Sequence, residues 1–131
     1  MSEAKIKILV IDDEPEIVSS FQFLFTEMFQ GYDFFSAQDG ATGLAVIERE
    51  HPDVMLLDLK LGAGIDGIEV LRRSRKFHPT IKTIVLTGYL DIRLEKEARS
   101  IGVDFYLKKP VDNPEEIEKI IRDLVGVKHA P

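Results

Sequence analysis

Residues 6–15 read IKILVIDDEP, a hydrophobic run that ends in three acidic residues and a proline. The run Ile6–Ile11 is mostly apolar and β-branched, which is typical of a strand buried on both faces of a sheet. Pro15 favours the first turn of a helix directly after the run. The acidic residues Asp12, Asp13 and Glu14 therefore stand between a buried strand and a helix.

Four more β-rich runs follow, and they alternate with stretches of helical period. The runs are Asp33–Ala37, Val54–Leu57, Thr83–Leu86 and Asp104–Leu107. The positions that mark the five helices are Ile17, Phe21, Leu24, Phe25 and Met28; Leu44, Ile47 and Glu48; Ile68 and Leu71; Leu94, Ala98 and Ile101; and Ile117, Ile120, Ile121 and Leu124. Five strands alternating with five helices predict an α/β fold, a doubly wound parallel sheet with helices on both faces.

The composition bounds the class of protein. A chain of 131 residues with 44% hydrophobic residues suits one packed domain, and the absence of cysteine excludes disulfides and thiolate metal sites. The net charge of −6 disfavours direct binding to nucleic acid. No apolar run has membrane-spanning length, so we expect a cytoplasmic protein. We expect the domain to occupy residues 1–125, with a tail or the start of a linker at 126–131.

Polar residues follow several of the predicted strands. In open parallel sheets, ligands bind at the carboxyl ends of the strands, where the strand order reverses. Asp12 and Asp13 follow the first strand, Asp58 the third, Thr87 the fourth and Lys109 the fifth. Each has an ordinary explanation when taken alone, as a helix-start acid, a turn residue, a strand-end hydroxyl or a solvated lysine. Their joint occurrence at four strand ends predicts one functional site.

The residue types at these strand ends indicate phosphoryl chemistry. Crowded carboxylates repel each other, and a hard divalent cation such as Mg²⁺ relieves that repulsion. An aspartate can attack a phosphoryl donor and form an aspartyl phosphate. The Thr87 hydroxyl and the Lys109 ammonium can then bind the phosphoryl oxygens.

The same segments resemble the signature blocks of response-regulator receiver domains of two-component systems, over nearly the whole chain. The blocks are ILVIDDE at 8–14, LLD at 56–58, DG at 66–67, VLTG at 85–88 and YLKKP at 106–110. This resemblance implies a flavodoxin-like sheet with strand order 2-1-3-4-5. It also implies a signalling domain that catalyses only its own phosphorylation and dephosphorylation.

The resemblance assigns roles around the metal ion and the phosphoryl group. Asp58 becomes the phosphoacceptor and a ligand of Mg²⁺ or Mn²⁺, together with Asp13 and the backbone carbonyl of Lys60. Asp12 becomes an outer-sphere partner of the metal ion. Lys109 corresponds to the phosphoryl-binding lysine because it directly precedes Pro110, and we expect a cis peptide bond between these two residues.

The resemblance also implies a conformational switch, in which Thr87 moves toward the phosphoryl group and the Tyr106 ring turns inward. Lys60 and Tyr89 flank the path of the hydrolytic water, and we expect the Tyr89 ring to slow dephosphorylation. The implied partners are a sensor histidine kinase or phosphotransfer protein and a downstream target or output domain. A homodimer through the face of the fourth helix, fifth strand and fifth helix is implied as well.

One segment departs from the family pattern, and three alternatives stay open. Gly62-Ala63-Gly64 replaces the usual proline-containing stretch, and the distance from Asp58 to Asp66 is one residue longer than usual. The family pattern therefore does not predict how the backbone carbonyl of Lys60 would be placed relative to the metal ion. The alternatives are a Mg²⁺-dependent phosphatase with an aspartate nucleophile, a flavin-binding module of the same fold, and a domain that binds partners without phosphorylation.

Overall fold

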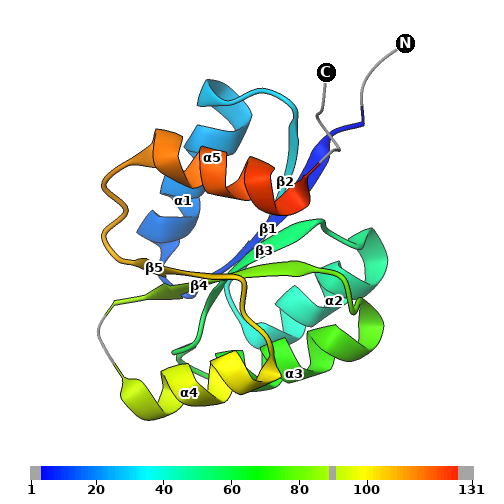
Figure 1. Ribbon diagram of the computed structural model, residues 1–131, viewed down its shortest axis with the longest axis vertical. Coiled ribbons are helices and arrows are strands. Elements are labelled where there is room, and N and C mark those ends of the chain that lie inside the picture. Colours follow the sequence, from blue (N-terminus) through cyan, green and yellow to red (C-terminus); the bar gives the residue numbers. More distant parts are fainter. Residues whose placement is uncertain (1–3, 89–90, 127–131) are drawn as a thin grey trace.

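The five strands form one parallel sheet in the computed structural model, which describes residues 4–88 and 91–126 (Figure 1). The strands are β1 (Ile6–Ile11), β2 (Tyr32–Ala37), β3 (Val54–Asp58), β4 (Lys82–Thr87) and β5 (Phe105–Lys108). Their spatial order is β2-β1-β3-β4-β5, and all neighbouring pairs are parallel. The fold class and the strand order implied by the sequence are confirmed.

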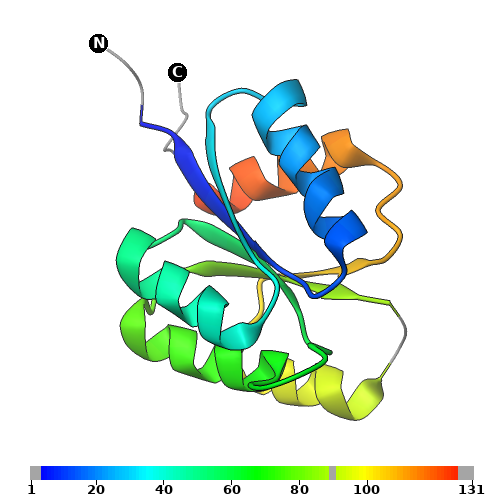
Figure 2. The ribbon, with the colours of Figure 1, turned by 180° about the vertical axis from the view of Figure 1, so that it is seen from behind.

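Helices cover both faces of this sheet. They are α1 (Pro15–Phe23), α2 (Gly40–Glu50), α3 (Gly67–Phe77), α4 (Ile92–Ile101) and α5 (Pro114–Val125), and a π-helical turn, η1 (Leu24–Met28), extends α1. Helices α1 and α5 lie on one face, and α2, α3 and α4 lie on the other (Figures 1 and 2). No helix in the described part of the chain is both long and apolar enough to cross a membrane.

Side-chain caps begin four of the helices. The side chains of Asp39, Asp66, Asp91 and Asn113 each accept a hydrogen bond from the backbone N–H three residues later, at 2.8 to 3.2 Å. Such caps satisfy donors that the first helical turn leaves unbonded. Helix α1 has no side-chain cap and begins at Pro15, which has no N–H to satisfy.

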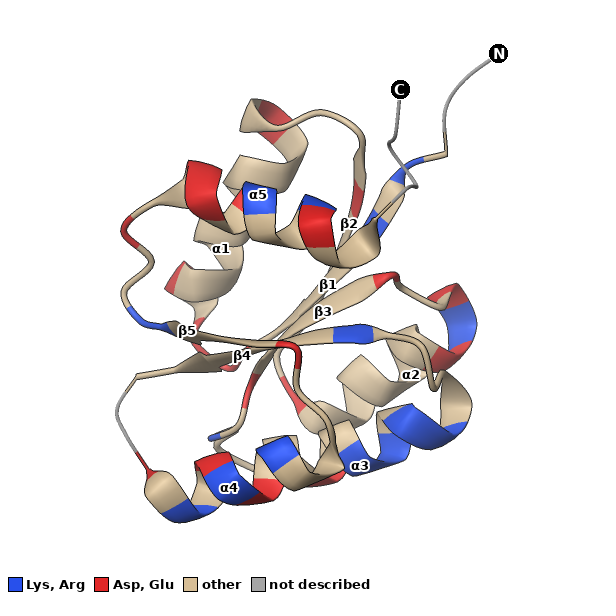
Figure 3. Cartoon of the chain, in the orientation of Figure 1, with Lys and Arg blue, Asp and Glu red and all other residues tan. Residues whose placement is uncertain are grey.

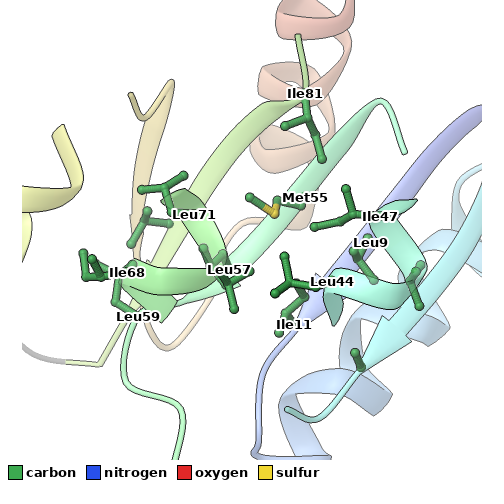
Figure 4. Close-up of a cluster of buried hydrophobic side chains, with 14 of the residues drawn as sticks. Leu9, Ile11, Leu44, Ile47, Met55, Leu57, Leu59, Ile68, Leu71 and Ile81 are labelled. Atoms are coloured by element: carbon green, nitrogen blue, oxygen red, sulfur yellow. The ribbon is translucent and has the colours of Figure 1, made fainter. Parts of the chain in front are cut away.

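The core consists of two apolar layers, one on each face of the sheet. Toward α2 and α3, Leu9, Ile11, Met55 and Leu57 pack against a set from the two helices that includes Leu44, Ile47, Ile68 and Leu71 (Figure 4). Toward α1 and α5, the alternate strand residues pack against Phe21, Phe25, Ile117 and Ile121. Because β1 and β3 are covered on both faces, their sequences are apolar on consecutive residues rather than alternating, apart from Lys7 in β1 and the terminal Asp58 of β3.

The end of the first helix differs from the prediction. The wider π-helical turn, closed by a hydrogen bond of 2.8 Å from Phe29 N–H to Leu24 C=O, shifts the phase of the following side chains. Met28 is therefore 51% exposed, so the prediction that it shares one helix face with Phe21 and Phe25, which are buried, is wrong. Glu48 is likewise exposed, whereas Val46 and Ile47 are the buried residues of that turn of α2.

The three arginines of α3 contact neighbouring groups; Figure 3 shows the basic residues of this helix in blue. Arg72 and Arg73 form ion pairs with Glu69 at 2.9 and 2.7 Å. Arg75 turns toward the sheet and donates 2.6 Å hydrogen bonds to the carbonyls of Ile81 and Gly102. Arg75 therefore joins α3 to the segments before β4 and after α4.

Candidate functional site

The predicted polar residues converge at the carboxyl edge of the sheet, where the strand order reverses between β1 and β3. Asp13, Asp58, Thr87 and Lys109 border a cavity of about 270 Å³. Its lining includes Asp13, Glu14, Asp58, Lys60, Thr87, Gly88, Asp91, Glu95, Tyr106 and Lys109. Residues from four strand ends thus face a single open volume, which is the arrangement that the topology predicts.

Lys109 lies at the centre of the charged groups. Its ammonium is 3.0 Å from Glu14 Oε1 and 3.2 Å from Asp58 Oδ2, with hydrogen-bond geometry to both, and 2.7 Å from Asp12 Oδ2. The side chain is only 10% exposed. Burial by itself lowers the pKa of Lys109, but its contacts with Asp12 and Glu14 and the charge of Asp58 outweigh burial and raise that pKa above its usual value. Lys109 is therefore a fixed positive charge beside Asp58. The Lys109–Pro110 bond is cis, as predicted.

Asp12 is fully buried, and one of its oxygens lacks a directed hydrogen bond. Oδ1 accepts from the Glu14 N–H at 2.9 Å. Oδ2 has no partner with hydrogen-bond geometry, although Lys109 Nζ is close enough for an ion pair. Burial raises the pKa of Asp12, against the opposing effects of Lys109 and the Glu14 N–H. A buried carboxylate oxygen that lacks a directed hydrogen-bond donor needs another source of positive charge, and a bound cation next to it would supply that charge.

Asp58 is the last residue of β3 and is 6% exposed. Oδ1 accepts from the Lys60 N–H at 2.8 Å, and Oδ2 faces Lys109. The start of α3 packs against the backbone here, since a Cβ on Gly67 would lie 2.5 Å from the Asp58 carbonyl oxygen. Glycine at position 67 allows this approach and so helps to hold the loop after β3 over the cavity.

Asp13 lines the same cavity from the loop after β1, but its partner comes from the unusual glycine-containing loop. Oδ2 of Asp13 accepts from the Gly62 N–H at 2.8 Å. Lys60, two residues after Asp58, extends its ammonium to within 3.4 Å of Asp91 Oδ2 at the start of α4. The loop after β3 therefore contacts both sides of the cavity.

Thr87 and Tyr106, the proposed switch residues, also line the cavity. Thr87 ends β4 and is half-buried. The Tyr106 hydroxyl donates to the Glu95 carbonyl of α4 at 3.1 Å, and the Arg99 guanidinium carbon is 4.4 Å from the ring centroid. Tyr89, the predicted dephosphorylation residue, lies outside the described residues.

The oxygen ligands suit a hard divalent cation. Asp12, Glu14 and Asp58 each offer a carboxylate oxygen, and these atoms lie within 4.8 Å of one another. Oxygen-only ligands favour Mg²⁺ or Mn²⁺ over softer metals. Asp13 is not in this group, although it borders the cavity with Asp58. These residues fit the ion that the sequence implies.

Glu14 is the residue that sequence reasoning missed. The sequence explains it only as an acid at a helix start, yet its carboxylate binds Lys109 and joins the three-carboxylate group. The signal was present in the run of three acidic residues directly before Pro15. When the start of a helix faces a site, an acidic residue there can contact groups in the site and also interact favourably with the helix dipole.

Comparisons with known proteins agree with this geometry. The Response regulator receiver domain family profile matches residues 8–122. The chain is 36% identical over 121 residues to Sporulation initiation phosphotransferase F of Bacillus subtilis (strain 168), covering 91% of this chain and 90% of that protein. It is also 36% identical to the Probable transcriptional regulator ycf27 of Porphyridium aerugineum, covering 92% of this chain and 48% of that protein.

A solved structure of similar fold is the response regulator receiver domain protein (CheY-like) from Methanospirillum hungatei JF-1. It shares 31% identity with this chain at a TM-score of 0.86. The alignment covers 95% of this chain and 97% of the other. The similarity therefore extends over nearly the whole of both chains.

Proposed function

The chain belongs to the response regulator receiver domain family of two-component signalling, and we propose that it is a phosphorylation-activated switch whose phosphoacceptor is Asp58. One observation carries this proposal. Asp58 presents its carboxylate to the cavity at the strand reversal, with the buried Lys109 ammonium 3.2 Å away and two further carboxylates beside it. That combination supplies a nucleophile, a charge for the incoming phosphoryl oxygens and ligands for a cation.

The proposed step is transfer of one phosphoryl group. An Asp58 carboxylate oxygen forms a bond to phosphorus while the bond from phosphorus to the donor breaks, and its electron pair leaves with the donor. Charge develops on the phosphoryl oxygens during transfer, so fixed positive charge beside them favours reaction. Lys109 provides that charge, and the Thr87 hydroxyl provides a hydrogen-bond donor from β4.

Receiver domains bind Mg²⁺ through acidic residues, and this chain has such residues at the expected place. We assign Asp13, Asp58 and the Lys60 backbone carbonyl as ligands of Mg²⁺ or Mn²⁺, with Asp12 in the outer sphere. A bound ion supplies positive charge that neutralises the phosphoryl oxygens. Oδ2 of the buried Asp12 supports this assignment, because it faces the Lys109 ammonium without a directed hydrogen bond and a nearby metal ion would add to the positive charge around it.

The proposed output is a movement of Thr87 and Tyr106. A change of population from 1:99 to 99:1 needs roughly 5.5 kcal/mol of differential interaction. Two charge-assisted hydrogen bonds, at about 1.5–3 kcal/mol each, give about that much or less. We therefore propose partial activation, completed by a partner or by dimerisation through the face of α4, β5 and α5.

The partners follow from the same proposal. Family members interact with histidine kinases or phosphotransfer proteins and with output domains. We propose a sensor kinase or phosphotransfer protein as donor, and a protein target or output domain as receiver of the signal. We also propose that the receiver domain occupies residues 1–125 and that the protein is cytoplasmic. Lys60 and Tyr89 are proposed to control the rate of dephosphorylation.

Incubation with Mg²⁺ and a small phosphodonor tests the function and separates it from the phosphatase alternative. We expect intact-mass analysis to show the gain of one phosphoryl group. No gain is expected when a chelator removes the Mg²⁺ before the donor is added. A phosphatase would instead release phosphate from a phosphoester over many turnovers without accumulating a labelled protein. Many turnovers with no labelled species would contradict the switch assignment.

A further inference from the structure

Tyr106 is held against α4 by two contacts that come from one turn of that helix. Its hydroxyl donates to the Glu95 carbonyl at 3.1 Å, and its ring lies 4.4 Å from the Arg99 guanidinium carbon. The Glu95 carboxylate binds Arg99 through Nε at 3.3 Å and Nη2 at 3.1 Å. Because residues four apart share one helix face, Glu95 orients Arg99 over the ring while its carbonyl holds the hydroxyl.

We propose that Arg99 is a positioning residue of the switch, which holds the Tyr106 ring against α4 and opposes its inward turn. This inference rests on the proposed function, in which Tyr106 moves after phosphorylation of Asp58. The contacting atoms come from the middle of α4, whereas the phosphoryl chemistry occurs at the strand ends. Arg99 therefore acts through Tyr106 and not on the reacting atoms.

The geometry explains why an arginine suits this position. A guanidinium is planar and stacks on an aromatic face, and at an exposed site this contact is modest in strength. Arg99 is largely exposed, with its side chain at 57%. In the proposed switch, the inward ring leaves both Arg99 and the Glu95 carbonyl, so the two contacts of the described conformation are lost together. We call the contacts among Glu95, Arg99 and Tyr106 the Tyr106 clamp. These contacts are weak enough to break when the ring turns inward, and their loss adds to the free energy that the switch requires.

The position of the clamp connects it to the phosphoryl site. Glu95 and Tyr106 line the same cavity as Asp58, Thr87 and Lys109. A ligand that favours the inward ring must open the clamp, and by linkage the opening of the clamp must favour that ligand equally. Loss of the Arg99 contact should therefore raise the affinity for a phosphoryl analogue by about two- to five-fold.

Beryllofluoride, an analogue of the phosphoryl group, tests this inference at saturating Mg²⁺. Calorimetric titrations would compare the wild type with Arg99→Gln and with Arg73→Gln. Arg73 is a matched control because it forms the same type of i,i+4 ion pair, with Glu69 on α3. We expect about two- to five-fold tighter binding for Arg99→Gln and the wild-type affinity for Arg73→Gln.

A double-mutant cycle then shows whether Arg99 acts through the ring. In a Tyr106→Leu background, Arg99→Gln should produce no further change in beryllofluoride affinity. Equal affinities of Arg99→Gln and the wild type would overturn the inference while leaving the proposed function standing. A gain that persists without the Tyr106 ring would also overturn it. A wild type that binds no beryllofluoride would contradict the proposed function, and the role of Arg99 with it.

Discussion

The backbone N–H of Gly62 donates a 2.8 Å hydrogen bond to Oδ2 of Asp13, and so joins the loop after β3 to the acidic run after β1. This contact lies in the segment where the sequence departs from the family pattern. A Cβ at position 62 would lie 2.7 Å from the same carboxylate oxygen. Glycine therefore lets the backbone approach a proposed metal ligand directly, and the unusual loop is part of the site.

Gly62→Ala should weaken Mg²⁺ binding with little change in stability. The added methyl group meets only the end of a flexible side chain, so Asp13 can turn away without disturbing the core. We expect a loss of up to about tenfold in Mg²⁺ affinity, the lower end for groups that orient metal ligands. Calorimetric Mg²⁺ titration and urea unfolding measure the two quantities. The neighbouring exposed Ala63→Ser serves as control, and unchanged affinity in Gly62→Ala would contradict the role of this contact.

Gly67→Ala should instead destabilise the fold. Its Cβ would lie 2.5 Å from the Asp58 carbonyl oxygen, and a backbone atom cannot move aside as a side chain can. Overpacking of this kind costs about 1–3 kcal/mol. Urea unfolding measures the loss, and Gly88→Ala is the control because a Cβ there meets nothing within 4 Å. Equal stability of the two variants would show that the start of α3 is not packed as described.

The fold could be predicted because short segments of the sequence determine its strands and helix starts. Buried strands such as Ile6–Ile11 are apolar at every position but Lys7, and caps such as Asn113 mark helix starts within a few residues. The strand-end rule also brought Asp58, Thr87 and Lys109 to one cavity. These features depend on neighbours in the sequence and on a general property of parallel sheets.

The remaining features depend on contacts between distant segments. The exposure of Met28 follows from a π-helical turn, whose spacing no apolar pattern reveals. The pairing of Glu14 with Lys109 spans 95 residues, and the contact of Tyr106 with Arg99 depends on how α4 lies beside β5. Such contacts are set by tertiary packing, so the sequence predicts the residues but not their partners.

Lys109→Met should destabilise the protein in a way that Mg²⁺ partly reverses. The substitution leaves Asp12, Glu14 and Asp58 crowded without their cation. Removal of one partner from a buried pair costs about 3–5 kcal/mol, and we expect about 3 because the cavity opens to water. Mg²⁺ should stabilise this variant more than the wild type, since no ammonium competes for the carboxylates. Urea unfolding with and without Mg²⁺ measures both effects.

The exposed Lys108→Met provides the control for that measurement, because it removes a charge of the same sign at the adjacent position. It should leave both the stability and the effect of Mg²⁺ close to those of the wild type. A Lys109→Met variant as stable as Lys108→Met would show that Lys109 does not neutralise the carboxylates.

Tyr32 should make stability sensitive to alkaline pH. Tyr32 is 7% exposed, and its hydroxyl donates to Glu118 at 3.1 Å. Burial and the Glu118 charge raise the pKa of Tyr32 to about 12, against the opposing effect of Arg122. The unfolded-state pKa is about 10. The folded state therefore holds this proton more tightly, so its contribution to stability is complete below pH 10 and is lost as pH rises toward 12.

The corresponding experiment compares Tyr32→Phe with the wild type by urea unfolding from pH 8 to pH 11. Between pH 10 and 11 the free energy of unfolding of the wild type should fall by about 1 kcal/mol more than that of the variant. At pH 8 the variant should be the less stable by about 1 kcal/mol, because it lacks the hydrogen bond to Glu118. Parallel pH profiles would mean that the Tyr32 proton is not held by the fold.

The most direct test of the central claim is the intact mass of Asp58→Asn after incubation with Mg²⁺ and a small phosphodonor. An amide keeps the shape of the side chain but is a poor nucleophile. Asp53→Asn is the matched control, since Asp53 lies just before the opposite end of β3 and its carboxylate accepts from the Lys7 N–H. We predict one added phosphoryl group in the wild type and in Asp53→Asn, and none in Asp58→Asn. Undiminished labelling of Asp58→Asn would contradict the account.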